Sequence, residues 1–197
     1  MNQPTTDKKL YCFWFEHSMS LNRKRCYRSM LKNCKVELIL ITEKNIKNFE
    51  VEGHAFHPEF YNLSGYHKAD YLRAYFMYYY GGGYSDIKNI EFDWNPYFDM
   101  LDESDKMAIG YREKRPEDIN YPEAKIIYEQ IIGTGAFIHK KGSKIAKDWL
   151  DQAEKRLDNK HPLRYTEIGG DIWHKVQVEN LGNWLFDLPY IDMNNYR

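Results

Sequence analysis

Short apolar runs and one-sided helical patterns alternate along the first half of the chain. Residues 10–15 (LYCFWF) and 36–41 (VELILI) are apolar runs of strand length. Between them, residues 21–32 carry Leu21, Cys26 and Met30 among many basic residues, which predicts an imperfectly amphipathic helix. A strand, a helix and a strand within about 30 residues form a βαβ unit. This unit predicts an α/β domain with a mostly parallel central sheet flanked by helices.

A stronger helical pattern follows in residues 68–80. Leu72, Tyr75, Phe76 and Tyr79 recur at helical spacing and form one apolar stripe. Glycines 81–83 are expected to end this helix. Residues 84–92 then predict a strand, in which Tyr84, Asp86 and Lys88 would point the same way.

The second half of the chain is expected to consist mainly of helices and loops. Residues 122–132 predict a short helix closed by Gly133, and residues 143–157 predict a longer helix with Ser143 as its N-cap. No linker or repeat divides the 197 residues. We therefore expect a flexible tail at residues 1–9 and a single domain over residues 10–197.

Composition excludes several classes of protein. The 28 basic and 29 acidic residues leave a net charge of −1, so no broad field is available to hold a nucleic acid or a membrane surface. No apolar run approaches the ~20 residues of a spanning helix, and the polar start lacks the apolar core of a signal peptide. A soluble, cytoplasmic protein is expected. The three cysteines are expected to be reduced and packed, and the aromatic content of 16% suits either sugar or base stacking or a large core.

Candidate chemistry begins at Asp70 and Arg73, which are neighbours on the predicted helix and lie away from its apolar stripe. Such a pair alone is typical of a surface salt bridge. Here it is followed by three glycines, Tyr84 and Asp86. The glycines follow a helix and precede a strand, which disfavours a dinucleotide-binding turn. A carboxylate beside such a turn can instead hold Mg²⁺ or Mn²⁺.

The segments 67–73 (HKADYLR) and 78–88 (YYYGGGYSDIK) resemble a known signature in composition, order and spacing. It is the S-D-x-x-R … Y-x-x-G-G-x-Y-x-D-x-D pattern of glycosyltransferases with a DXD sugar-binding region, the group that includes capsular-polysaccharide and Och1-like transferases. Residues 11–15 are similar to the first strand of that family, and residues 133–142 are similar to its later segment near the donor sugar.

This resemblance implies a GT-A fold, a nucleotide-diphosphate sugar as donor, a divalent cation and retention of anomeric configuration. By the same resemblance, Asp70 and Arg73 would contact the ribose and sugar of the donor, and Asp86 would be the first aspartate of DXD. Trp14 would stack on the nucleobase, although an ordinary core tryptophan remains an alternative. Tyr84 would border the donor.

The chain departs from the signature at Lys88, which replaces the second aspartate of DXD. Either Asp86 binds a cation with help from elsewhere, or Lys88 itself offsets the charge of the diphosphate. The segment 162–174 (PLRYTEIGGDIWH) offers His174 as the missing metal ligand, with Asp171 and Glu167 behind it. A packed histidine is the competing interpretation.

The sequence therefore predicts a glycosyltransferase that moves a sugar from a UDP-sugar, or less favourably a GDP-sugar, to a glycan or other hydroxyl acceptor, assisted by Mn²⁺ or Mg²⁺. A first alternative is a degenerate protein that binds nucleotide sugar or glycan without turnover. A second is an assembly subunit in which the aromatic residues 75–80 form an interface. No nucleic-acid partner and no transmembrane segment are expected.

Overall fold

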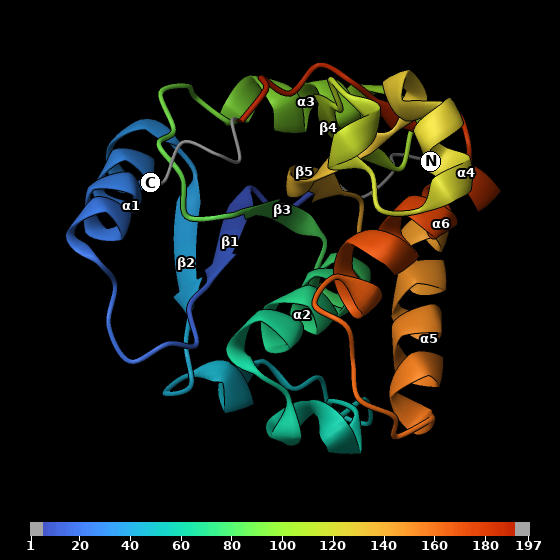
Figure 1. The fold of residues 1–197 in the computed structure, drawn as a ribbon. Coiled ribbons are helices and arrows are strands. Elements are labelled where there is room, and N and C mark those ends of the chain that lie inside the picture. The colour runs from blue at the N-terminus through green and yellow to red at the C-terminus, as the bar shows by residue number, and fades with distance from the viewer. Residues whose placement is uncertain (1–5, 192–197) are drawn as a thin grey trace.

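A mixed α/β sheet with helices on both faces organises the molecule (Figure 1). The computed structural model describes residues 6–191, and within them the chain forms a six-stranded sheet of order β2-β1-β3-β5-β4-β6. The β1–β2, β1–β3 and β4–β6 pairs are parallel, and β5 runs antiparallel to both of its neighbours. The predicted α/β fold with a mostly parallel sheet is confirmed. The strands are β1 Lys9–Phe13, β2 Glu37–Ile41, β3 Gly82–Ser85, β4 Ala108–Arg112, β5 Ile132–His139 and β6 Trp184–Leu185.

The alternation of side chains along β1 separates two cores. Leu10 and Cys12 pack with α1 and α3 on one face of the sheet. Tyr11 and Phe13 point to the other face, where both rings contact Phe76 of α2 at centroid distances of 4.9 and 5.3 Å. The helices are α1 Leu21–Asn33, α2 Gly65–Tyr79, α3 Asn95–Glu103, α4 Pro122–Ile126, α5 Lys144–Asp158 and α6 Ile172–Glu179.

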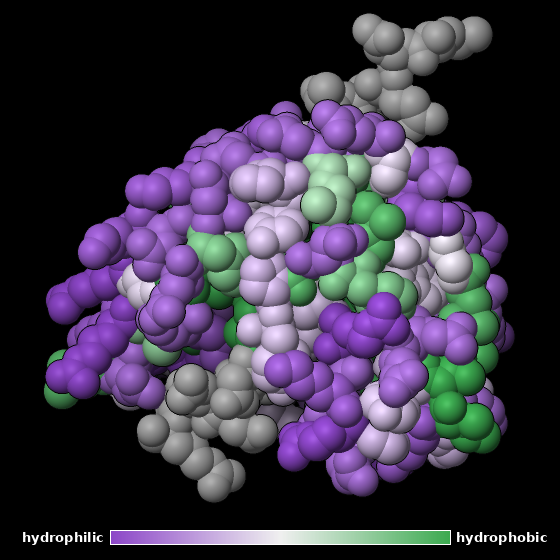
Figure 2. Space-filling view, turned by 90° about the horizontal axis from the view of Figure 1, so that it is seen from above, coloured by the Kyte–Doolittle hydropathy of each residue, from purple (hydrophilic) through white to green (hydrophobic). Residues whose placement is uncertain are grey.

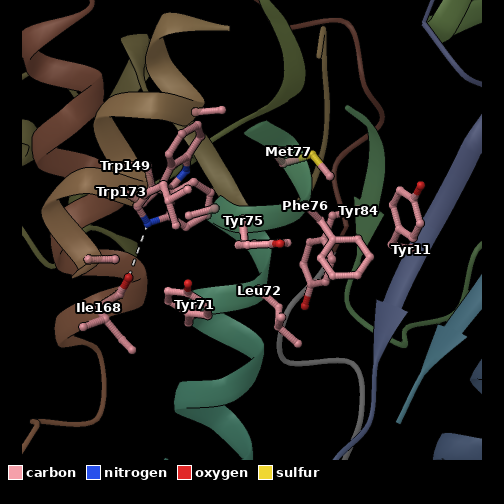
Figure 3. Packing of buried hydrophobic residues seen from close by; sticks show 14 of the residues in the cluster. Tyr11, Tyr71, Leu72, Tyr75, Phe76, Met77, Tyr84, Trp149, Ile168 and Trp173 are labelled. Atoms are coloured by element: carbon pink, nitrogen blue, oxygen red, sulfur yellow. Dashed lines mark hydrogen bonds between the residues drawn. The ribbon is translucent and has the colours of Figure 1, made fainter. Parts of the chain in front are cut away.

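The larger core surrounds α2, as Figure 3 shows. On one side α2 packs against the sheet, and on the other it meets the Trp149–Trp173 pair, whose ring centroids are 4.4 Å apart. The Trp149 indole donates to the Ile168 carbonyl at 3.3 Å, which holds the π-helical turn Glu167–Asp171 against α5 (Figure 3). This turn is thereby fixed beside α2.

The aromatic face of α2 belongs to this core. Tyr75 and Phe76 are buried inside the molecule, while Tyr79 is half-buried. The alternative in which residues 75–80 form an interface with another subunit is therefore wrong for the first part of that segment. These rings already pack against β1 and the loops before α2, so they are not available to a second subunit.

Two predicted elements end earlier than expected. The strand predicted over residues 84–92 stops at Ser85, because the carbonyls of Ile87 and Ile90 accept hydrogen bonds from α1 side chains rather than from a neighbouring strand. The helix predicted over residues 122–132 ends at Ile126 and continues as a 3₁₀ turn. Gly133, expected as its cap, lies inside β5.

The amino-terminal segment is held more closely than predicted. The Thr6 amide donates to the Asp102 carboxylate at 3.0 Å, and β1 begins at Lys9. Of the predicted tail, residues 1–5 lie outside the described residues. Cys12, Cys26 and Cys34 are free and buried, as expected. Within residues 6–191, no helix combines the length and apolar character that crossing a bilayer requires.

Candidate active site

A cleft of about 670 Å³ opens where β1 and β3 end. Because these strands are parallel neighbours, their carboxyl ends meet at one edge of the sheet and bring Trp14 close to Asp86. The first half of α2 forms one wall, and residues 165–170 border the opening. All six donor-site residues predicted from the sequence line this cleft; they are Trp14, Asp70, Arg73, Tyr84, Asp86 and Lys88.

Arg73 lies at the centre of a charged network in the cleft. Its guanidinium contacts the carboxylates of Asp70 at 3.2 Å and Asp86 at 3.5 Å. It also lies 5.0 Å from the centroid of the Tyr84 ring, a cation–π distance. Its Nε is buried without a hydrogen-bond partner among the described residues. The guanidinium is thus held in place but retains an unused donor.

Asp86 presents one occupied and one available oxygen. The Tyr84 hydroxyl donates to Oδ1, and the Arg73 contact reaches the same atom. Within residues 6–191, no hydrogen bond reaches Oδ2. The Asp86 amide donates to the Gly135 carbonyl at 2.8 Å, which anchors the strand end to β5. The carboxylate is only 19% exposed, because Arg73 and Tyr84 enclose it.

Asp70 is buried between α2 and the π-helical turn. Burial raises the pKa of its carboxyl above the ordinary value, although the positive charges of Arg73 and His67 oppose the shift. A Cβ on Gly169 would lie 2.5 Å from the Asp70 carboxyl carbon, so only glycine allows this close approach. The paired glycines at 169–170 therefore shape the site.

Trp14 and Arg23 form a second feature of the cleft. The Arg23 guanidinium lies 5.9 Å from the centre of the Trp14 ring, and both residues line the cleft. The Trp14 indole nitrogen is buried and has no partner in the described part of the chain. A half-buried ring with a vacant N–H donor can stack on a flat ligand and bond its edge.

Lys88 lies at the cleft, but its orientation does not come from the strand alternation that the sequence predicted. It lies beyond the end of β3, so the alternation of a regular strand does not orient it. Its side chain is nevertheless buried at the cleft, where Arg23, Arg73 and Lys88 supply three basic groups. These groups balance the lining carboxylates of Asp70, Asp86 and Glu16, and they can bind an anionic ligand.

Comparison with known proteins bears on the fold. No protein-family model matches the chain, and no curated protein matches it. Among solved structures, one titled "PaToxG Glycosyltransferase" is similar, with a TM-score of 0.54 and 18% identity, over 89% of this chain and 70% of that one. The chain has the fold of a glycosyltransferase. The resemblance to the DXD group stays a prediction.

The predicted metal ligands are not gathered together. His174 is 1% exposed and does not line the cleft. Burial lowers its pKa to about 4, and its Nδ1 accepts the Asn120 amide at 3.2 Å. The other candidates are engaged by arginines: Glu167 by Arg156 at 2.8 Å and Asp171 by Arg164 at 3.1 Å.

This arrangement does not make a dedicated metal centre. No group of three or more His, Cys, Asp or Glu side chains in the described range is placed to hold an ion. Asp86 Oδ2 could supply a single oxygen. A cation would fit here only when it is shared with diphosphate oxygens of a bound donor.

Sequence reasoning missed several residues of the cleft. Arg23 lies on the helix predicted over residues 21–32, where its position carries no site motif. Asn120 and Tyr66 lie outside every motif, and Tyr165 lies in the segment 162–174, which pointed only to metal ligands. All three reach the cleft through tertiary packing. Tyr66 and Tyr165 are 54% and 68% exposed, and their ring centroids are 5.2 Å apart.

Proposed function

We propose that this protein is a glycosyltransferase that takes a sugar from a nucleotide-diphosphate sugar, with a UDP-sugar favoured, and passes it to a hydroxyl acceptor with retention of configuration. The observation that carries the proposal is the Arg73 network at the strand-edge cleft of a glycosyltransferase fold. Because the guanidinium keeps an unused donor and Asp86 keeps an unused oxygen, the network is prepared for a polyhydroxyl ligand.

The donor would lie along the cleft from Trp14 to Asp70. The base would stack on Trp14, and the buried indole N–H would bond a polar atom of the base or ribose. Arg23 and Lys88 would offset the charge of the diphosphate. Sugar hydroxyls would donate to the carboxylates of Asp70 and Asp86, while Arg73 would orient both.

In the proposed reaction, the bond between the anomeric carbon and the diphosphate oxygen breaks, and its electron pair stays on the diphosphate. The acceptor oxygen forms the new bond on the same face of the sugar. Its proton passes to the departing diphosphate oxygen, so no dedicated base is required. The basic residues at the cleft stabilise the charge that develops on the leaving group.

A divalent cation remains part of this proposal, with Mn²⁺ or Mg²⁺ as the candidate. Bound by diphosphate oxygens and Asp86 Oδ2, it would supply further positive charge beside the leaving group. Since the protein itself offers few ligands, metal and donor should bind together. We expect weak Mn²⁺ binding to the free protein and tighter binding in the presence of UDP.

The acceptor would enter past Tyr66 and Tyr165, which border the opening of the cleft. His67 fixes this opening, because its Nε2 lies within hydrogen-bond distance, 3.1 Å, of the Arg164 carbonyl. Exposed tyrosine rings bind the apolar faces of sugars. A glycan acceptor agrees with this chemistry.

The degenerate binding protein remains a second candidate, favoured by Lys88 at the position of the second DXD aspartate. The same cleft would then hold nucleotide sugar without turnover. Measurement of donor binding and donor hydrolysis in parallel separates the two functions.

The test is a panel of nucleotide sugars, with and without Mn²⁺, for wild type and for Asp86→Asn. Asparagine keeps the shape of the side chain and an acceptor for Tyr84 but removes the charge. We expect hydrolysis to fall at least about 100-fold in a folded variant. Asp105→Asn is the matched control, because that side chain is 87% exposed and pairs with Lys106 rather than with a residue of the network. Wild-type hydrolysis by Asp86→Asn, or no donor bound by wild type, would contradict the proposal.

A further inference from the structure

The segment formed by α1 and the two residues after it is basic and carries no acidic residue. Residues 21–35 contain six basic residues and no acidic one, whereas the rest of the chain carries 22 basic and 29 acidic residues, a net charge of −7. The overall charge of −1 therefore conceals a strong local asymmetry. A local excess of positive charge creates an electrostatic field beside the helix even when the whole molecule is nearly neutral.

Four of these six basic residues, Lys24, Arg25, Arg28 and Lys32, share one face of the helix. Cys26 and Met30 face the core, and the positions on the opposite side recur at spacings of three and four. All of them are exposed, and the side of the molecule that α1 forms is mostly hydrophilic, at the left of Figure 2. We call this set the basic face; it comprises Leu21, Lys24, Arg25, Arg28, Leu31, Lys32 and, just beyond the helix, Lys35.

The charges of the basic face are not neutralised by the protein. Among the described residues, none of its five basic side chains forms an ion pair or a hydrogen bond. Other helices carry paired cations, as with Lys144 and Lys147 on α5. An unpaired row of four cations on α1, with a fifth just beyond the helix, is suited to an anionic surface.

Two exposed leucines favour a phospholipid bilayer over a nucleic acid as the anionic surface. Leu21 is 76% exposed and precedes the row of cations, and Leu31 is 55% exposed and lies within it. Leucines have no favourable contact with a nucleic-acid backbone. In a bilayer they enter the region of the headgroups, while lysine and arginine side chains extend to the phosphates.

We propose that the basic face docks this protein on an anionic phospholipid bilayer. Arg23 leaves α1 on the side of the cleft rather than on the basic face, so docking leaves the cleft open. The inference does not depend on the transferase function. It revises the expectation, drawn from net charge alone, that no membrane surface is bound.

The experiment is flotation of the full chain with phosphatidylcholine vesicles, with and without phosphatidylserine. Wild type should bind only the vesicles that contain phosphatidylserine, and added salt should weaken the binding. Each basic residue near such a surface strengthens partitioning about fivefold, so Lys24→Glu/Arg28→Glu/Lys32→Glu should weaken it at least about 100-fold. Leu21→Ser/Leu31→Ser should weaken it about tenfold or more.

The control variant Lys125→Glu/Lys141→Glu/Lys155→Glu changes the net charge equally at exposed residues elsewhere, and it should bind as wild type does. Donor binding, measured in all variants, should remain unchanged, which separates this inference from the proposed function. Equal loss in the control variant, or undiminished binding by the α1 triple variant, would overturn the inference. Binding of random-sequence DNA through α1, with no binding of phosphatidylserine vesicles, would assign the basic face to nucleic acid instead.

Discussion

Two half-buried arginines hold carboxylates in and beside the π-helical turn, and their contacts differ. Arg156 bonds both oxygens of Glu167, at 2.8 and 3.0 Å, and also reaches the His161 and Pro162 carbonyls. Arg73 makes only single contacts, at 3.2 Å to Asp70 and 3.5 Å to Asp86. Its Nε has no partner in residues 6–191.

These contacts indicate that Arg156 stabilises the fold, whereas Arg73 is available to bind a ligand. A forked pair with every donor bonded stabilises the segment that it ties down. An enclosed guanidinium with loose contacts and a vacant donor loses solvation without full compensation. Such an arrangement is expected where binding, rather than stability, shaped the site.

The most direct test of this difference is the same substitution at both arginines. Lysine keeps the charge but loses the planar fork. Arg73→Lys should reduce donor turnover at least about 100-fold while shifting the melting temperature little. Arg156→Lys should cost about 1–3 kcal/mol of unfolding free energy and leave donor affinity unchanged.

Denaturant unfolding and donor titration of both variants decide the matter. If Arg73→Lys lowers stability as much as Arg156→Lys does and binds donor normally, then Arg73 is structural.

The second prediction concerns the glycine that touches Asp70. Gly169→Ala places a methyl group 2.5 Å from the Asp70 carboxyl carbon, so the carboxylate must move away from Arg73. We expect donor affinity to fall about tenfold or more, with a loss of about 1–3 kcal/mol in stability.

The matched control is Gly142→Ala. Gly142 has φ +70°, so alanine is strained there, but a Cβ meets nothing within 4 Å. Stability should fall by about 1 kcal/mol while donor affinity stays constant. Equal donor affinity in the two variants would show that Asp70 is not positioned by the turn.

Local sequence patterns predicted that four residues of the cleft lie close together. Asp70, Arg73, Tyr84 and Asp86 lie within one stretch, and a helix followed by a glycine turn and a short strand places them together whatever the rest of the chain does. Arg23 and Tyr165 are distant from this stretch in sequence. Only the packing of α1 and of residues 161–171 brings them to the cleft.

The second half of the sheet was missed for an identifiable reason. β5 (IGTGAFIH) contains two glycines, which have low strand propensity. Gly133 is required there because a Cβ would lie 2.0 Å from the Tyr111 ring on β4. The residue that looks like a helix cap in the sequence is set by a contact across the sheet, which no local pattern reveals.

The third prediction uses pH to separate the two clusters. Burial raises the pKa of Asp70, so the native state binds a proton more readily than the unfolded state does, and stability falls as pH rises above the unfolded pKa of 3.8. The Arg156 bonds lower the pKa of Glu167, so its contribution is present above 4.5 and is lost as pH falls through the folded pKa.

These signs are opposite and can be measured by urea unfolding from about pH 4 to about pH 7. Relative to wild type, Asp70→Asn should gain stability as pH rises, while the deficit of Glu167→Gln should grow. If the stability difference from wild type changes with pH in the same direction for both variants, the two arginine–carboxylate clusters do not differ in this respect.

The smallest effect is expected at the opening of the cleft, where we propose that uncharged tyrosine rings contact the acceptor. Tyr66 and Tyr165 contact each other edge to face at 5.2 Å and remain largely exposed, so neither ring contributes much to the core. A ring that stacks on an acceptor sugar contributes about 0.5–1.5 kcal/mol. Tyr66→Ser and Tyr165→Ser should therefore raise the KM for a glycan acceptor about threefold to tenfold and leave donor hydrolysis unchanged. Tyr61→Ser is the control, because Tyr61 is 44% exposed and does not line the cleft. Reduced donor hydrolysis in the Tyr66 and Tyr165 variants would place these rings on the donor side, and an unchanged acceptor KM would remove them from the site.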